Sequence, residues 1–199
     1  MARKDKATRQ KEIIDEALKI IHKQGYKALT IKELSKKVRI SEPAIYRHFR
    51  SKEDIILGIL HRIEVFEETL RIQLLETDKN ELPLNRFVKL HLQYFESNPE
   101  ITSIIFSEDI FRESKRLSGK LLKIIGKRRK IVQKMITDCN INKGKNGLNP
   151  GNLSTIILGF IRLLVLEWRL SGFKYSLSQK GEEGLMTLTK LIYAYKIKK

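Results

Sequence analysis

The residues best suited to a chemical role lie between Thr30 and Lys52. Small and polar residues, Ser41 to Ala44, stand at the expected start of a short helix. Three larger polar side chains follow within the next turn, namely Tyr46, Arg47 and His48. Hydroxyl, guanidinium and imidazole groups behind such a low-profile front are suited to hydrogen bonding with phosphates and base edges. The segment therefore predicts a contact with nucleic acid.

Helix-start signals place these residues in a helix-turn-helix. Thr30 and Ser51 each open a capping-box pattern, and Ser41 is a favourable N-cap followed by a proline that the first turn of a helix tolerates. The pattern predicts helices that begin just after these three residues. In a helix-turn-helix the second helix enters the major groove, while helix N-termini and basic side chains hold phosphates.

The charge of the chain is concentrated in two regions. Of a formal net charge of +17, residues 1–52 carry +9, from 15 Lys and Arg against 6 Asp and Glu. Residues 115–134 hold nine further basic residues and no acid. This balance favours nucleic acid, an anionic membrane surface or anionic ligands as partners. Four cations near the N-terminus are expected to form a flexible arm for phosphates or the minor groove: Arg3, Lys4, Lys6 and Arg9.

Hydrophobic periodicity is helical nearly everywhere, which predicts an all-α chain of about nine helices. The expected helices run approximately over 8–25, 31–38, 42–49, 52–77, 84–97, 100–112 (one helix or two helical turns), 113–139, 152–171 and 181–197. The helix at 152–170 is apolar on nearly every side, so it must be covered on both faces. It is either a central core helix of a monomer or, with the last helix, a four-helix dimer seam. The candidate interface residues are Ile157, Ile161, Leu164, Leu188, Leu191, Ile192 and Tyr195.

Several other classes of protein are disfavoured. The charged N-terminus does not resemble a secretory signal, and the longest apolar stretch, Leu153 to Leu166, is short for a membrane span and contains Arg162. A single cysteine, Cys139, excludes an internal disulfide and indicates a reducing, cytoplasmic setting. No nucleophile elbow, phosphate loop or zinc-protease motif occurs, and adjacent acids such as those at 67 and 68 suit helix surfaces. We therefore expect no enzyme, metal or cofactor, and no membrane partner.

With these elements in place, the chain resembles the TetR/AcrR family of transcriptional regulators. The resemblance rests on four segments: Ile13–Ala17, Gly25–Thr30, Ile31–Ser35 and, above all, Ser41–Lys52. It implies a three-helix DNA-binding head over residues 1–52, joined to a larger helical ligand-binding and dimerisation body over 53–199. One position departs from the family pattern, because Arg39 stands where the turn usually carries glycine. A left-handed backbone there costs a non-glycine residue about 1 kcal/mol.

The resemblance also assigns site residues. By position, four residues correspond to phosphate contacts of the family: Thr30, Tyr46, His48 and Lys52. Five more correspond to positions that face bases, with Ser41 at the front of the same helix: Lys32, Glu42, Pro43, Ala44 and Arg47. Glu42 either accepts a hydrogen bond from cytosine or is simply an acid favoured by the helix dipole. Ile45 and Phe49 are expected in the core.

Within the body, the family implies an effector pocket. Its candidate residues are Phe66, Leu70, Phe87, His91, Tyr94, Phe95, Phe106 and Trp168. Each is alternatively an ordinary core residue, and the apolar lining suggests a small hydrophobic or amphipathic effector. The basic stretch at 115–134 is either the solvated face of an amphipathic helix or a contact for an anionic effector, DNA or acidic lipid.

The sequence thus predicts a homodimeric DNA-binding regulator. We expect a repressor that is released from a palindromic operator on double-stranded DNA by a small-molecule effector. The alternative is a DNA-bound interaction protein on the same fold, similar to nucleoid-occlusion factors, whose body meets a protein partner in place of a ligand.

Overall fold

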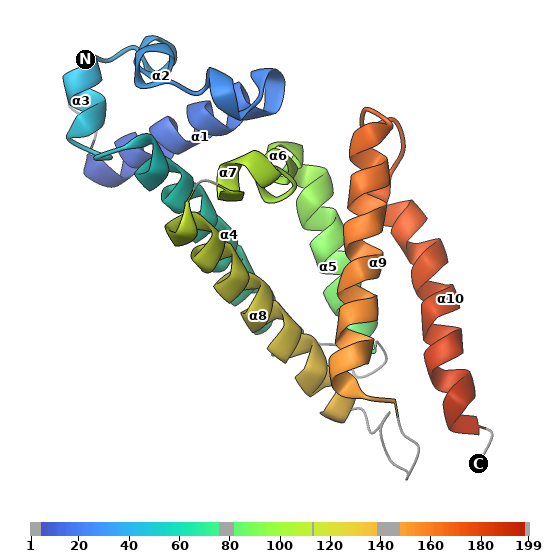
Figure 1. Ribbon diagram of the computed structural model, residues 1–199. Coiled ribbons are helices and arrows are strands. Elements are labelled where there is room, and N and C mark those ends of the chain that lie inside the picture. The colour runs from blue at the N-terminus through green and yellow to red at the C-terminus, as the bar shows by residue number, and fades with distance from the viewer. Residues whose placement is uncertain (1–4, 76–81, 113, 139–147, 198–199) are drawn as a thin grey trace. The chain divides into compact units, whose positions relative to one another are not determined.

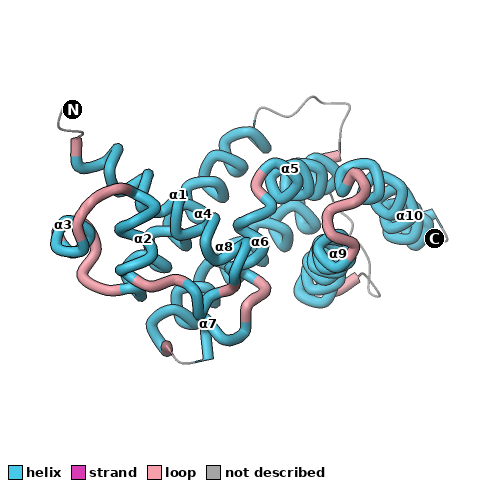
Figure 2. The backbone as a smooth tube through the Cα atoms, turned by 90° about the horizontal axis from the view of Figure 1, so that it is seen from above, coloured by secondary structure: helices cyan, strands magenta, loops and turns pink. Residues whose placement is uncertain are grey.

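The computed structural model describes residues 5–75, 82–112, 114–138 and 148–197, and these are helices joined by loops without a strand (Figures 1 and 2). The helices are α1 (Lys6–Gln24), a short 3-10 helix (Tyr26–Ala28), α2 (Ile31–Val38), α3 (Glu42–Tyr46), α4 (Lys52–Leu75), α5 (Pro83–Ser97), α6 (Pro99–Ile105), α7 (Glu108–Arg112), α8 (Lys115–Asp138), α9 (Pro150–Leu170) and α10 (Leu177–Ile197). The all-α prediction is confirmed. Of the two alternatives predicted for 100–112, the structure has the two short helices, α6 and α7. Cys139 lies outside the described residues.

The chain divides into two compact units. The first unit comprises Met1–Phe66 and Pro99–Lys123, and the second comprises Glu67–Asn98 and Ile124–Lys199. The long helices α4 and α8 each contribute to both units. The predicted boundary at residue 52 separates a DNA-binding region from a ligand-binding region, whereas these units are defined by compactness. The predicted boundary therefore stays a prediction.

The predicted caps organise the first unit. The side chains of Thr30 and Ser41 accept hydrogen bonds from the backbone N–H groups of Glu33 and Ala44, which starts α2 and α3 as expected. The buried face of α1 packs against α2 and α6. Ile45 is wholly buried and Phe49 nearly so, as predicted for core positions, and Leu34 of α2 is also wholly buried. Asp5 caps α1 at its first turn, so Lys6 and Arg9 are helical residues and not part of a flexible arm. Arg3 and Lys4 lie outside the described residues.

The turn between α2 and α3 does contain the left-handed residue that the family pattern suggests. Arg39 has φ 58° and ψ 46°, and its N–H and that of Ile40 return to carbonyls of the last turn of α2. Since a Cβ disfavours this conformation, we expect Arg39→Gly to raise the free energy of unfolding of this unit by about 1 kcal/mol. Urea titration followed by circular dichroism measures the gain. Arg39→Ala keeps the Cβ and is the control; an equal gain from alanine would show that the arginine side chain, and not the backbone, is responsible.

In the second unit α5, α9 and α10 pack side by side (Figure 1). The contact is close because α10 carries glycine where it meets its neighbours: a Cβ on Gly181 would lie 2.0 Å from Leu92, and one on Gly184 would lie 2.6 Å from Phe160. Tertiary contact also moves the start of α10 to Leu177, before the predicted position. The carboxylate of Glu96 on α5 accepts the N–H of Leu177 at 2.8 Å and thus caps α10 from outside.

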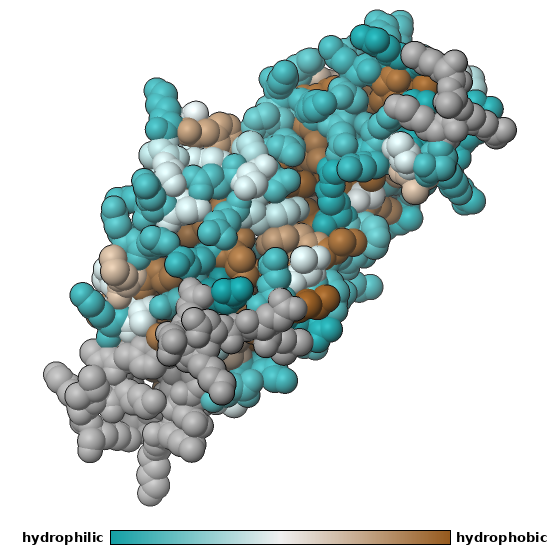
Figure 3. All heavy atoms as spheres, turned by 180° about the vertical axis from the view of Figure 1, so that it is seen from behind, coloured by the Kyte–Doolittle hydropathy of each residue, from teal (hydrophilic) through white to brown (hydrophobic). Residues whose placement is uncertain are grey.

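The surface is mixed in polarity on the face seen from behind (Figure 3). Hydrophilic side chains cover most of the face drawn in Figure 3, and apolar ones show between them. Within the described ranges, no helix combines the length and the apolar character that a membrane crossing requires.

Candidate DNA-binding surface and effector region

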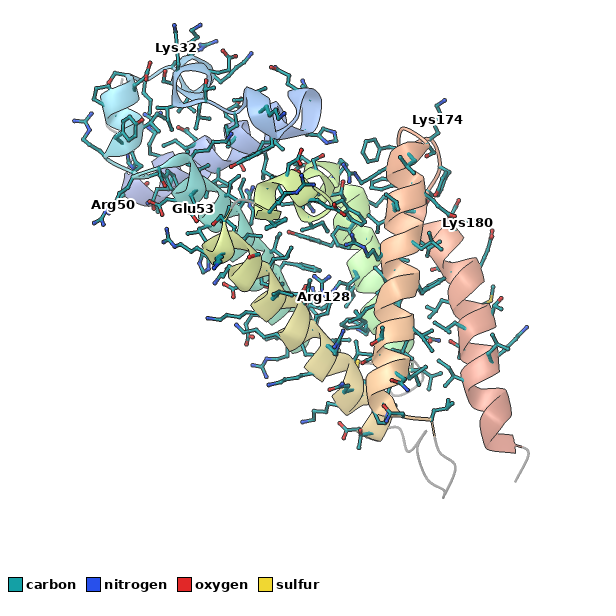
Figure 4. The ribbon with its side chains drawn as sticks, in the orientation of Figure 1. Lys32, Arg50, Glu53, Arg128, Lys174 and Lys180 are labelled. Atoms are coloured by element: carbon teal, nitrogen blue, oxygen red, sulfur yellow. The ribbon has the colours of Figure 1, made fainter. Side chains whose placement is uncertain are left out.

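The predicted recognition residues lie on the outside of the head. Thr30, Lys32, Ser41, Glu42, Pro43, Tyr46 and Arg47 are exposed, and Ala44, His48 and Lys52 are partly buried. Lys32 lies on the outer side of α2 (Figure 4). On α3 the buried Ile45 fixes the orientation, because its side chain enters the core and turns the neighbouring polar residues outward. The arrangement leaves one side of α3 free to approach a flat or grooved partner.

A hollow of about 760 Å³ joins α3 to the start of α1. Its lining residues are Asp5, Lys6, Arg9, Ile40, Ala44, Arg47 and His48. The folding of α1 therefore brings two cations of its N-terminal end, Lys6 and Arg9, beside α3, the helix predicted to read the bases. The hollow is lined by three cations and by one carboxylate, that of Asp5, and Arg9 also pairs with Glu12, so the remaining positive charge favours an anion such as a backbone phosphate. Sequence reasoning found each of these cations but not their gathering around a single site.

The surroundings of His48 favour the neutral form of its imidazole. Burial lowers the pKa of its imidazole, and the positive charges of Arg9, Lys6 and Arg47 lower it further. A neutral imidazole still donates a hydrogen bond, so the predicted phosphate contact of His48 would be a neutral hydrogen bond and not an ion pair.

Lys52 also has a structural role. Its ammonium donates to the carbonyl oxygen of Tyr26 at 2.9 Å and lies 3.6 Å from the centre of the Tyr26 ring. These contacts connect the start of α4 to the 3-10 helix that precedes α2. A lysine ammonium carries three donors, so the predicted phosphate contact is compatible with this position.

The predicted effector residues fall in both units. Phe66 and Phe106 belong to the first unit and are partly buried; the other six belong to the second. Leu70, Phe87, His91, Phe95 and Trp168 are buried there, and Tyr94 is partly buried. The rings of Phe87 and His91 are 4.2 Å apart, whereas the indole N–H of Trp168 donates to the carbonyl of Tyr175 in the α9–α10 turn. Phe87 and His91 therefore lie in contact on α5, and the side chain of Trp168 holds the turn between α9 and α10.

A buried charged cluster includes His91 and was missed from the sequence. Glu67 on α4 is 6% exposed, although its pairing with Glu68 suggested a surface position. The Nε of Arg128, from α8, donates to Glu67 Oε1 at 2.8 Å, and His91 Nε2 on α5 lies 3.5 Å from the same oxygen (Figure 4 labels Arg128). Among the described residues Glu67 Oε2 has no hydrogen-bond partner. Arg128 is thus an exception to the predicted solvated face of α8.

The charge states of this cluster follow from its surroundings. Burial alone would raise the pKa of Glu67, but Arg128 and His91 together, through their charge and hydrogen bonding, lower that pKa to about 2. Burial, and then the charge of Arg128, lower the pKa of His91, whose Nδ1 donates to the carbonyl of Phe87 at 2.9 Å. The cluster therefore places an ionised carboxylate and a guanidinium beside a buried imidazole.

The candidate interface residues differ in how far they are buried within the single chain. Ile157, Ile161, Leu164 and Ile192 are buried within the single chain, so they belong to its own core. Leu188 is partly buried, Leu191 is exposed, and the side chain of Tyr195 lies outside what the structure describes. The exposed apolar face of α9 consists of other residues: Ile156, Leu163, Leu166 and Leu170.

Comparison with known proteins agrees with this arrangement. Residues 13–59 match the model of the tetR family of bacterial regulatory proteins. The nucleoid occlusion factor SlmA of Vibrio campbellii is 27% identical over 186 residues, which cover 92% of this chain and 95% of that protein.

Two solved structures share the fold across both units. The fatty acid degradation regulator FadR of Bacillus halodurans superposes with a TM-score of 0.79 at 19% identity, over 96% of this chain and 97% of that one. The transcriptional regulator FadR of Bacillus subtilis, solved in complex with stearoyl-CoA, gives 0.76 at 21% identity over 89% and 96%. The N-terminal segment 13–59 therefore matches the tetR family of bacterial regulatory proteins, and the chain shares its fold with the two FadR regulators.

Proposed function

We propose that the protein is a homodimeric, cytoplasmic transcriptional repressor that binds a palindromic operator and leaves it when a small effector binds. The observation that carries the DNA contact is the hollow between α1 and α3, where Lys6, Arg9 and Arg47 gather beside the exposed start of α3. Phosphate contacts of this kind hold the head in register, while exposed side chains of α3 read base edges.

The proposed dimer rests on the outer face of α9. Ile156, Leu163 and Leu170 recur every seven residues, with Gly159 and Leu166 between them, and the side chain of Leu170 is 80% exposed. A stripe with this spacing is typical of a helix that packs against a partner helix. Two copies of the chain would then present two heads to half-sites about 34–36 Å apart, or a multiple of that distance.

The proposed effector is hydrophobic or amphipathic. Apolar residues around Phe87 supply the apolar part of a binding region, and the unpartnered Glu67 Oε2 is a polar atom that a ligand donor would satisfy. A structural neighbour that binds stearoyl-CoA supports a ligand with an apolar chain. The effector would act by linkage: it binds better to the state that does not fit the operator, and so it lowers the affinity for DNA.

The experiment that tests this function has two steps. DNA bound by the purified protein is first selected from a random pool, and a palindromic consensus is expected. Metabolites are then screened for release of that DNA, with acyl thioesters and free fatty acids as the first sets. Failure to enrich any sequence would contradict the proposed function at its first step.

A prediction follows for the recognition helix. Arg47→Ala is expected to weaken binding to the selected operator by about 1–3 kcal/mol, because it removes a contact to a base or to a phosphate. Fluorescence anisotropy at several salt concentrations distinguishes the two cases: loss of a phosphate contact reduces the log–log salt slope by about 0.9, and loss of a guanine contact relaxes the preference at one base pair. Arg129→Ala removes an exposed arginine of the second unit and serves as control. Equal affinities for both variants would rule out a contact by Arg47.

A DNA-bound interaction protein is a second candidate function. The similarity to SlmA, which extends over 92% of the chain, favours it. The metabolite screen separates the two candidates, because only an effector-controlled repressor is released from DNA by a small molecule. Operator binding that no metabolite alters would favour the interaction protein.

A further inference from the structure

A second hollow, of about 540 Å³, lies between α4 and the first half of α8. Leu57 and His61 line it from α4, and five residues line it from α8: Lys115, Arg116, Gly119, Lys120 and Lys123. We call this hollow the basic groove. All of its residues belong to the first unit, which also contains the DNA-binding head. The hollow between α1 and α3 has other lining residues, so the basic groove is a separate site.

The charge in the basic groove opposes the helix dipole. Ser114 caps α8 by accepting the N–H of Leu117 at 3.1 Å, and the first turn that follows begins with Lys115 and Arg116 and contains no acid. Because a helix N-terminus is itself positive, acids are favoured there and cations are disfavoured. The basic groove therefore adds two cations to an already positive position, an arrangement that a bound anion would stabilise.

The acids of α4 neutralise only part of this charge. Arg116 lies 2.9 Å from Asp54 Oδ1 and 3.8 Å from Glu53 Oε2, and Lys120 pairs with Glu64. Within the described part of the chain, Lys115 and Lys123 form no ion pair. Both are exposed, so the basic groove has two cations available to a ligand and two more that already hold carboxylates.

The floor of the basic groove is open. A Cβ built on Gly119 meets no atom within 4 Å, so nothing in the chain fills the space above this part of α8. Ammonium and guanidinium groups spaced around an open floor suit an extended anion with several acceptor oxygens, because each cation can meet a different oxygen. A single carboxylate would leave most of these donors without a partner.

We propose that the basic groove is a binding site for a small anion that carries two linked phosphate groups. Lys115 and Lys123 supply the two cations that, among the described residues, are not paired with a carboxylate. Arg116 and Lys120 would bind the anion in place of their carboxylate partners on α4, or bind both at once. The anion would therefore loosen the ion pairs that connect α4 to α8 next to the head. If binding of the anion changes the affinity for the operator, that effect rests on the proposed function. Binding of the anion to the basic groove does not rest on it.

The first test uses the complete protein without DNA. Isothermal titration with inorganic pyrophosphate is expected to show saturable binding of one ion per chain, with orthophosphate at least about tenfold weaker because it reaches fewer of the cations. ADP provides the second arm: tighter binding than pyrophosphate would assign the site to a nucleotide, and equal binding would assign it to the diphosphate alone. Lack of saturable binding by both ligands would overturn the proposal.

Substitutions then locate the site. Lys115→Gln combined with Lys123→Gln is expected to reduce the affinity for pyrophosphate about tenfold or more, and Gly119→Gln is expected to do so by filling the floor. The controls are Lys130→Gln combined with Lys134→Gln, and Gly126→Gln, whose added Cβ also meets no atom within 4 Å. These lie further along the same helix and should leave the affinity within about twofold. Equal losses in both sets would mean that general positive charge, and not the basic groove, binds the anion.

Operator DNA provides the last arm. If the Lys115 and Lys123 variant loses affinity for DNA and its salt slope falls while pyrophosphate binding is unchanged, then the basic groove is a DNA contact and the proposal is wrong. Thermal melts of each variant, followed by circular dichroism, separate loss of a site from loss of folding. The titrations need no DNA. The proposed anion site can therefore be disproved while operator binding is observed, and operator binding can be disproved while the anion site is observed.

Discussion

Arg128→Met is expected to lower the free energy of unfolding of the second unit by about 3–5 kcal/mol, because it leaves Glu67 buried without its counter-ion. The side chain of Arg128 is 16% exposed and that of Glu67 is 8% exposed, so water compensates little for the lost pair. Methionine fills most of the vacated volume, which keeps the effect electrostatic. The loss is large compared with the marginal stability of an ordinary domain.

The chain offers a convenient probe for this measurement. Trp168 is the only tryptophan, and it is buried in the second unit. Its fluorescence during urea titration therefore follows the unit that contains the pair. Arg129→Met is the matched control, since it removes an adjacent exposed arginine and should change stability by no more than about 0.5 kcal/mol. Equal effects of the two variants would contradict a buried ion pair.

A second substitution and the pH dependence identify the cause. Adding Glu67→Leu to Arg128→Met removes the isolated carboxylate and should recover most of the loss. In the native protein the pKa of Glu67 is lowered from 4.5 to about 2, so its contribution is complete above pH 4.5 and is lost as the pH falls toward 2. This shift corresponds to about 3 kcal/mol. Stability of Glu67→Gln should consequently fall less steeply over that pH range.

The DNA-binding head was predictable because its signals are local. Thr30 and Ser41 cap helices through contacts three residues away, and the alternation of Ile45 with polar neighbours is visible in the sequence. The left-handed conformation of Arg39 was expected for another reason, namely that the turn usually carries glycine at this position in the family that the chain resembles.

Features that depend on distant partners were not predictable. Glu67 and Glu68 are adjacent and chemically identical, and only the packing of α8 decides that one meets Arg128 and the other remains exposed. Likewise, Glu96 caps α10 across a long separation in sequence, so no local pattern marked Leu177 as the first residue of that helix. Helices can be predicted from interactions between residues close in sequence. Which charged side chain is buried depends on contacts between residues far apart in sequence.

The proposed dimer seam illustrates the same limit. A helix that is apolar all round, like α9, gives no sign of which face enters its own core. The structure buries Ile157, Ile161 and Leu164 within the chain, whereas Ile156 and Leu163 stay exposed. The predicted helix was therefore right, and the exposed face identifies different residues for the proposed partner contact.

Leu163→Asp is accordingly expected to dissociate the proposed dimer. Leu163 is 56% exposed in the single chain and lies at the middle of the stripe from Ile156 to Leu170. In a dimer this position would be covered, and an uncompensated carboxylate there would cost several kcal/mol for each subunit. Sedimentation equilibrium should then report the 23.3 kDa of one chain. Because its own core does not use Leu163, the variant should remain folded.

Leu122→Asp provides the matched control, because Leu122 is 66% exposed but lies on α8, outside the stripe. It should sediment as a dimer and bind the operator as the native chain does. The Leu163→Asp monomer should bind a palindromic operator much more weakly, and its affinity for an isolated half-site should be unchanged, since only the link between heads is lost. A dimer that survives Leu163→Asp would exclude the outer face of α9 as the seam. A monomeric native chain would exclude paired heads, and with them the palindromic operator.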